Sequence, residues 1–244
     1  MKSKKSTKNR NDKVLIVGFP SNGLVGTFTI SYLIHIQKMK QIGEIDHPDL
    51  PSAFFVENGE ILAPIRIYNK DNLYIIISDL PFDPFVAYDF AQSTLGFCKK
   101  QKISKIIIVS GLGIIDHVSK KSKIFGLITH PSLEEALYKN EIPKFLSGSI
   151  FGTDAAIISV FRKSNIPVLM LYVECHPFLP DLEASIVAIT SVAKILNIKV
   201  DTTDIQKNIE LLKIQNRNLM EETVKALQQQ HEKQPQARAP QIYR

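Results

Sequence analysis

The stretch that decides the fold is VLIVGFPSNGLVG, residues 14–26. Its first five residues form a short apolar run that ends in glycine, which is typical of a strand buried inside a sheet. Apolar residues then recur at helical spacing over residues 24–37. A buried strand, a glycine-containing turn and a helix in this order predict the first unit of an α/β sheet.

The rest of the chain continues the alternation of strands and helices. Further strands are expected at residues 53–56, 60–68, 73–78, 105–110, 125–129, 148–151 and 167–174. Helices are expected at residues 84–100, 130–138, 153–163 and 180–196, with Thr153 or Asp154 near the cap of the third. Asn58-Gly59 predicts a hairpin turn. We therefore predict one doubly wound α/β domain over residues 13–200, with a mostly parallel buried sheet plus a β-hairpin.

The two ends of the chain differ in composition from this domain. Of the formal net charge of +6, residues 1–13 carry +5, from five lysines and one arginine against one aspartate. This arm, residues 1–12, has no aromatic side chain on which a base could stack, so we interpret it as a solvated disordered arm and expect no nucleic acid partner. A nucleic-acid-associated protein that uses the arm stays as a third, weaker possibility.

A helix is expected at residues 201–230, with one apolar stripe that could pack on its own domain or on a neighbouring subunit. The stripe comprises Ile205, Ile209, Leu212, Leu219 or Met220, Val224 and Leu227. The following tail, residues 231–244, is rich in glutamine and proline and has too little apolar surface to fold, so we expect it to be flexible.

The tail ends in Ile242-Tyr243-Arg244 and a free carboxylate. A hydrophobic residue, a tyrosine and any residue at a C-terminus resemble the docking signal that proteasome-regulating proteins insert between adjacent α-subunits of the proteasome core. That resemblance implies a carboxylate paired with a pocket lysine, the tyrosine at the pocket mouth and the aliphatic side chain in an apolar slot. Capture of a C-terminal carboxylate in a preformed pocket is a recurring recognition mode.

The turn at residues 18–26 does not have the residues of a nucleotide site. A phosphate loop would need Lys-Ser or Lys-Thr after Gly23, and Leu24-Val25 stand there. The dinucleotide pattern needs two glycines separated by one residue, whereas Gly18 and Gly23 are separated by four. We expect its glycines to allow a tight turn and close helix–sheet packing, with no bound cofactor.

Several polar residues follow predicted strands, where open α/β sheets bind ligands. They are Asp79, Asp83, Asp116, His117, Glu174, His176 and Asp181. Such carboxylates and histidines could bind a metal or do acid–base chemistry, which leaves a small-molecule-binding α/β enzyme as the alternative function. Most of them alternate with prolines, as in surface loops where such residues act as caps, so we predict no catalytic residue and no metal site.

The composition suits a soluble protein of 244 residues with 44% hydrophobic and 22% charged residues. Cys98 and Cys175 are too few and too isolated for a zinc site or a disulfide framework. No apolar run is long enough to span a membrane, and no secretory signal precedes residue 14. We therefore expect a cytoplasmic protein with no membrane partner.

An ordered set of motifs is similar to the proteasome assembly chaperone two family. The motifs are residues 14–26, Ser78-Asp79-Leu-Pro81, the apolar strand and glycine turn at 107–113, Gly148-Ser-Ile-Phe-Gly152, Glu174-Cys-His-Pro177, Pro180-Asp-Leu-Glu-Ala-Ser185 and Val200-Asp201. The ending Ile242-Tyr243-Arg244 also looks like that of archaeal homologues in this family. The resemblance implies a non-enzymatic chaperone or regulator that forms homo-oligomers and presents several C-terminal tails to the α-subunits of the proteasome core particle.

Overall fold

The computed structural model describes residues 12–50, 53–57, 59–82, 84–114, 121–201, 203–205 and 207. Its centre is a seven-stranded sheet in the order β2-β5-β6-β1-β7-β9-β8, with a separate two-stranded sheet formed by β3 and β4. The strands are β1 (Val14–Gly18), β2 (Lys40–Glu44), β3 (Phe55–Glu57), β4 (Glu60–Leu62), β5 (Ile65–Lys70), β6 (Leu73–Ser78), β7 (Lys105–Gly113), β8 (Ile124–Ile128) and β9 (Val168–Cys175). The helices are α1 (Val25–Ile36), α2 (Pro84–Gln101), α3 (Glu134–Lys139), α4 (Gly152–Phe161) and α5 (Leu182–Leu196), with short 3-10 turns η1 (Asn22–Leu24) and η2 (Pro131–Leu133).

The sheet is parallel at its centre and antiparallel at its edges. Strands β6, β1, β7 and β9 run parallel to one another. On one side β5 and β2 continue the sheet in antiparallel pairs, and on the other side β8 pairs antiparallel with β9. The predicted α/β class with a mostly parallel buried sheet is confirmed, and the antiparallel edges make the whole sheet mixed.

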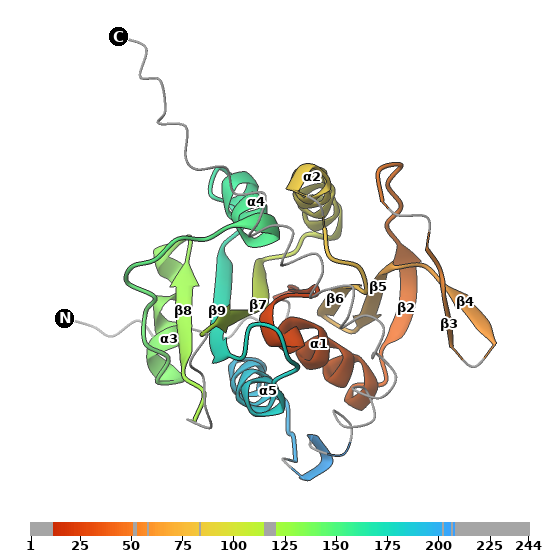
Figure 1. Ribbon diagram of the computed structural model, residues 1–244. Helices are drawn as coiled ribbons and strands as arrows, with labels where there is room; N and C mark the ends of the chain where they lie inside the picture. Colours follow the sequence, from red (N-terminus) through yellow and green to blue (C-terminus); the bar gives the residue numbers. More distant parts are fainter. Residues whose placement is uncertain are drawn as a thin grey trace, which may run out of the picture.

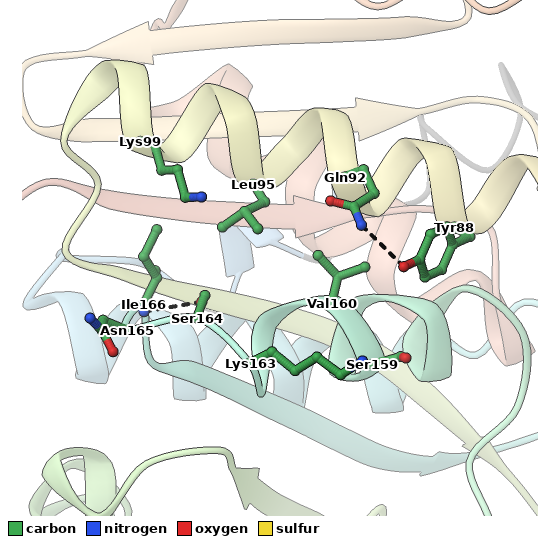
Figure 2. Close-up of a pocket in the computed structure, with 10 residues that line it drawn as sticks. All are labelled: Tyr88, Gln92, Leu95, Lys99, Ser159, Val160, Lys163, Ser164, Asn165 and Ile166. Atoms are coloured by element: carbon green, nitrogen blue, oxygen red, sulfur yellow. Dashed lines mark hydrogen bonds between the residues drawn. The ribbon is translucent and has the colours of Figure 1, made fainter.

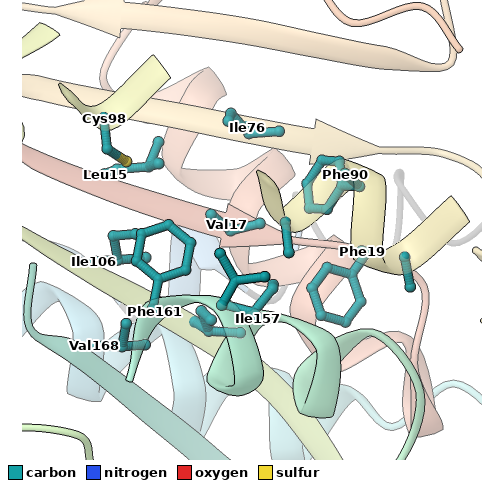
Figure 3. Close-up of a cluster of buried hydrophobic side chains, with 14 of the residues drawn as sticks. Leu15, Val17, Phe19, Ile76, Phe90, Cys98, Ile106, Ile157, Phe161 and Val168 are labelled. Carbon is teal, nitrogen blue, oxygen red and sulfur yellow. The ribbon is translucent and has the colours of Figure 1, made fainter. Parts of the chain in front are cut away.

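Helices cover both faces of the sheet, as a doubly wound fold requires (Figure 1). Side chains alternate along β1, so Leu15 and Val17 face α2 and α4, whereas Val14 and Ile16 face α1, α3 and α5. Figure 3 shows the first of these two cores, where Phe90 from α2 and Phe161 from α4 meet the sheet. Both faces of the central strands are buried, which explains their continuous apolar sequences.

The hairpin predicted around Asn58-Gly59 is confirmed by the antiparallel pairing of β3 and β4. The strand predicted at 60–68 is two strands, because the chain breaks at Ala63-Pro64 and β5 joins the large sheet while β4 stays in the hairpin. Proline lacks the N–H that a continuous ladder would need at this point. The strand predicted at 148–151 is wrong, since these residues form a connection that leads into α4. Strand β2 was not predicted.

Several predicted segments lie outside the described residues. They are the basic arm at 1–12 except Asp12, the helix at 201–230 beyond its first residues, and the tail at 231–244. Within the described part of the chain, no helix combines the length and apolar character needed to cross a bilayer.

Candidate functional site

The turn between β1 and α1 packs against the ends of β7 and β9. Gly23 and Leu24 both have positive φ angles, of 63° and 51°, which Gly23 adopts without strain. A side chain on Gly26 would lie 2.5 Å from the carbonyl oxygen of Val109, and one on Gly111 would overlap the carbonyl oxygen of Asn22. The predicted packing role of the glycines in residues 18–26 is therefore confirmed.

Polar groups of this turn bind the backbone of the neighbouring strand. Asn22 Nδ2 donates to the Gly111 carbonyl at 3.2 Å, and the Gly111 N–H donates to Ser21 Oγ at 3.3 Å. The backbone N–H of Asp181 donates to the Gly23 carbonyl at 3.0 Å. This is the point where the order of the parallel strands reverses around β1, and where open α/β sheets usually hold a ligand. Here the chain's own turn packs against that point.

Asp79, the first strand-end carboxylate, forms a buried ion pair with Arg66. Arg66 Nη1 lies 2.5 Å from Asp79 Oδ2, and Arg66 also donates to the Ala63 carbonyl at 2.6 Å and to the Tyr68 hydroxyl at 3.2 Å. Burial lowers the pKa of Arg66, but the Asp79 carboxylate beside it outweighs this, so the net shift of that pKa is upward. The pair joins the break at Ala63-Pro64 to the end of β6 and has a structural role.

Asp181 caps helix α5. Its Oδ1 accepts from the Ala184 N–H at 3.0 Å, and its Oδ2 accepts from the His176 N–H at 2.9 Å. His176 Nδ1 in turn accepts backbone N–H groups from Phe178 and Leu179, at 3.2 and 3.1 Å. These are the caps that the prolines around them suggested.

The other strand-end residues do not add a reactive cluster to the described part of the chain. Glu174 is the second-last residue of β9, and its backbone N–H donates to the Lys123 carbonyl. Asp83, Asp116 and His117 lie outside the described residues. Among the residues that are described, no three histidine, cysteine or acidic side chains stand close enough to bind one metal ion. Both cysteines are free and buried.

Asp154 has a buried carboxyl group that the sequence did not indicate as a site. The sequence pattern predicted only that this residue lies near a helix cap. The N-cap of α4 is Phe151, and Asp154 in the first turn faces inward, toward the hydroxyls of Ser110 and Tyr172. Burial raises the pKa of Asp154 to about 6, against hydrogen bonds from the two hydroxyls that lower it. Its Oδ1 has no hydrogen-bond partner among the described residues. No sequence signal linked the three residues, which come from β7, α4 and β9.

The first residues of the C-terminal segment are held on the domain. Ile205 is fully buried in a small cluster with Phe28, Tyr32 and Ile189 of α1 and α5. The Tyr32 hydroxyl donates to Asp204 Oδ2 at 3.2 Å, and burial together with the Asp204 carboxylate raises the pKa of Tyr32 to about 12. The first residue of the predicted stripe thus packs on its own domain. Ile242, Tyr243 and Arg244 lie outside the described residues.

An open groove of about 480 Å³ lies between α2 and α4 (Figure 2). Lys99 of α2 and Lys163, just after α4, stand on its two sides. Its other lining residues are Tyr88, Gln92, Leu95, Ser159, Val160, Ser164, Asn165 and Ile166. The groove combines apolar side chains with two cations, which suits an acidic, partly apolar partner.

The fold and these sites define a class: a three-layer α/β domain whose strand-end polar groups support its own structure. The chain belongs to the PAC2 family, whose family model matches residues 15–220.

Solved structures with the same fold include two proteins of Pyrococcus furiosus. PbaA, described as an archaeal homolog of proteasome-assembly chaperone, is 24% identical with a TM-score of 0.81, over 88% of this chain and 95% of PbaA. PbaB, described as an archaeal proteasome activator, is 20% identical with a TM-score of 0.72, over 85% of this chain and 93% of PbaB. An uncharacterized protein of Methanocaldococcus jannaschii is 21% identical over 222 residues, or 91% of each chain.

Proposed function

We propose that this protein is a non-enzymatic chaperone or regulator of the proteasome, which docks its C-terminal tail into pockets between α-subunits of the core particle. The observation that carries the proposal is the combination of a PAC2 domain with the ending Ile242-Tyr243-Arg244. Either feature alone is a weak argument, because the domain does not identify a binding group and a three-residue ending can arise by chance. The descriptions of PbaA and PbaB favour the same partner.

The contacts at the strand ends favour a binding protein over an enzyme. Catalytic groups need to reach a substrate, whereas Asp79 is paired with Arg66 and Asp181 caps α5. The turn at 18–26 packs on β7 where a ligand would bind in many α/β folds. Because these groups are used in structural contacts, we assign the binding function to the tail.

The tail would start from a fixed point on the domain. Ile205 is buried and Asp204 is bonded to Tyr32, so the last described residues of the chain lie beside α1 and α5. If residues 231–244 are flexible, as their composition predicts, they would span about 20 Å. That reach lets a tail find its pocket without fixed geometry.

Several tails on one oligomer would bind more strongly than one. A short peptide buries little surface and should bind with millimolar to high-micromolar affinity on its own. When copies of the chain associate, the second and later tails bind at a high effective concentration, which converts weak contacts into avidity.

The test is binding of tail variants of the full chain to isolated proteasome α-rings, followed by native mass measurement. Tyr243→Ala should weaken each tail by about 1–3 kcal/mol, the usual range for an aromatic anchor, and abolish detectable association. Arg244→Ala is the matched control and should have a mild effect, since the resemblance allows any residue there. Intact binding after deletion of residues 242–244 would refute the proposal.

A further inference from the structure

Positive charge gathers where α2 and α4 end. The segments that lead from these helices into β7 and β9, residues 99–105 and 162–167, contain no carboxylate side chain. Because β7 and β9 are parallel neighbours, both segments lie at the amino end of the sheet. We call their cations the basic end. It consists of Lys99, Lys100, Lys102, Lys105, Arg162 and Lys163.

The cations of the basic end are not neutralised by the domain. All except Lys105 are exposed, and none of the six forms an ion pair within the described part of the chain. Cations in the last turn of a helix offset the helix dipole. Lys102 and Lys105 lie beyond α2, so the dipole does not account for the whole group. A surplus of one sign on one part of a surface attracts ligands of the opposite charge.

The N-terminal arm is attached to the domain at the basic end. The carbonyl of Lys13, just before β1, accepts both the backbone N–H and the side-chain hydroxyl of Ser104, each at 2.8 Å. Residue 13 therefore lies against the segment that joins α2 to β7. Residues 1–12 hold five further cations against one aspartate. The order of the chain thus adds to the positive charge at this end of the molecule.

The groove between α2 and α4 adds apolar surface to this charge. Its lining residues on α2 recur at helical spacing from Tyr88 to Lys99, so the groove follows one face of that helix for about 16 Å. Leu95 and Val160 point into it from the two helices, and both pack on the core beneath (Figure 2). The groove is therefore apolar along its floor and cationic where it meets the basic end.

This combination favours a protein segment over a nucleic acid. Single-stranded nucleic acids are held by aromatic side chains on which bases stack. Tyr88 is the one aromatic residue that lines the groove, and it lies on α2 three turns away from Lys99, with its hydroxyl accepting from Gln92 Nε2 at 3.1 Å. A phosphate backbone offers nothing apolar to Leu95 and Val160. An amphipathic helix does, because it lays its apolar face into a groove and keeps its charged residues at the rim.

We propose that the α2–α4 groove and the basic end bind an acidic amphipathic segment of a partner protein. Apolar side chains of the segment pack on Leu95 and Val160, and its carboxylates face Lys99 and Lys163. The length of the groove matches about three turns of helix. Helices α2 and α4 cover one face of the sheet, whereas Ile205 packs on α1 and α5 at the other face (Figure 1). The surface is therefore separate from the start of the C-terminal segment, and the inference goes beyond the proposed function.

The experiment measures binding of labelled peptides to the full chain by fluorescence anisotropy. The probe is a peptide of about three helical turns, with leucines at i, i+3, i+4 and i+7 and with glutamate and alanine elsewhere. A second peptide has serine in place of every leucine and so keeps the charge. The leucine peptide should bind with a Kd of roughly 10–100 μM, as expected for one short segment. The serine peptide should bind about tenfold more weakly, because it cannot use the apolar floor.

Variants of the groove lysines then locate the binding site. Lys99→Glu with Lys163→Glu should weaken binding of the leucine peptide by about tenfold or more, because like charges would then face each other. Lys99→Gln with Lys163→Gln should cause a smaller loss and reduce the dependence of Kd on salt concentration. Lys194→Glu with Lys199→Glu is the matched control, since it makes the same charge change at two exposed lysines at the end of α5 and just after it. Its Kd should stay within about twofold of the wild type.

Several outcomes would overturn the proposal. They are no binding of the leucine peptide, equal binding of the serine peptide, binding that persists after reversal of Lys99 and Lys163, and an equal loss in the control pair. A single-stranded DNA of similar length that binds more tightly than the leucine peptide, and loses affinity on the same reversal, would assign the surface to a nucleic acid instead. The test contains no proteasome and leaves residues 242–244 unchanged, so tail docking and this surface can fail independently.

Discussion

The two ends of the parallel strands use their polar residues in different ways. At the carboxyl end, Asp79 is buried against Arg66 and Asp181 caps α5. At the amino end, where α2 and α4 finish before β7 and β9 begin, Lys99 and Lys163 are exposed beside an open groove. In open α/β sheets the carboxyl end normally binds ligands. In this chain the described carboxylates Asp79 and Asp181 at that end hold the fold, which directs the search for partner surfaces to the groove and the tail.

The largest expected loss of stability comes from removing the ion pair at the carboxyl end of the strands. Asp79→Ala would leave the Arg66 guanidinium buried without its counter-charge, and removing one partner of a buried pair typically costs about 3–5 kcal/mol. Urea unfolding measures the loss. The matched control is Asp89→Ala, whose carboxylate is exposed near His47 and should contribute less than about 1 kcal/mol. Equal effects of the two variants would mean that the buried pair is not structural.

The sequence predicted the central strands well and the edges poorly, for a physical reason. Strands buried on both faces, such as β1 and β9, are continuous apolar runs that periodicity detects easily. Strand β2 has one large apolar residue, Ile42, and even this is exposed beside a bulge. Its pairing with β5 comes from tertiary structure, which no local pattern in residues 40–44 records.

The next effect tests the close packing of the turn at 18–26. Gly111→Ala would place a methyl group where the Asn22 carbonyl oxygen lies, so the backbone of the turn must move. Overpacking costs about 1–3 kcal/mol or more, and we expect about 3 kcal/mol here because the obstacle is backbone.

Gly96→Ala is the matched control for this change. Gly96 lies in helix α2, and a side chain there meets no atom within 4 Å. The substitution should stabilise the protein by about 0.5–1 kcal/mol, because alanine is the better helix former. Thermal unfolding compares the two variants, and a tolerated Gly111→Ala would show that the turn is loosely packed.

A third, pH-dependent effect concerns Asp154. Because burial raises the pKa of this carboxyl from 3.8 to about 6, the fold favours its protonated form. The native state then binds the proton more tightly than the unfolded state, so this contribution to stability is largest below pH ~4 and is lost as pH rises toward 6. Asp154→Asn removes the ionisation. Its effect on the free energy of unfolding, relative to the wild type, should therefore be more stabilising at pH 7 than at pH 4, by up to about 3 kcal/mol.

Urea unfolding of the wild type and Asp154→Asn between pH 4 and 8 measures this difference, in which the other titrating groups cancel. A difference in unfolding free energy that stays constant with pH would contradict the assignment. As the pH falls below 6, the unfolding free energy of the wild type should rise relative to that of Asp154→Asn, because only the wild type takes up a proton at this position.

The candidate sites were predictable only where their chemistry is local in sequence. The cap formed by Asp181 was foreseen in kind, because prolines surround it and its partner Ala184 is three residues away. Arg66 and Asp79 were not paired by any pattern, and Asp154 meets Ser110 and Tyr172 only after three elements have packed together. The alternation of strands and helices therefore predicted the places of polar groups and not their partners.

The smallest expected change in stability comes from replacing the two exposed lysines at the amino end of the strands. Lys99→Ala with Lys163→Ala removes two exposed cations without an ion-pair partner among the described residues, so the monomer should keep its stability within about 0.5 kcal/mol. Urea unfolding compares the variant with the wild type. A marked loss of stability would show that the lysines hold the fold, as the carboxylates do at the other end, and the contrast between the two ends would disappear.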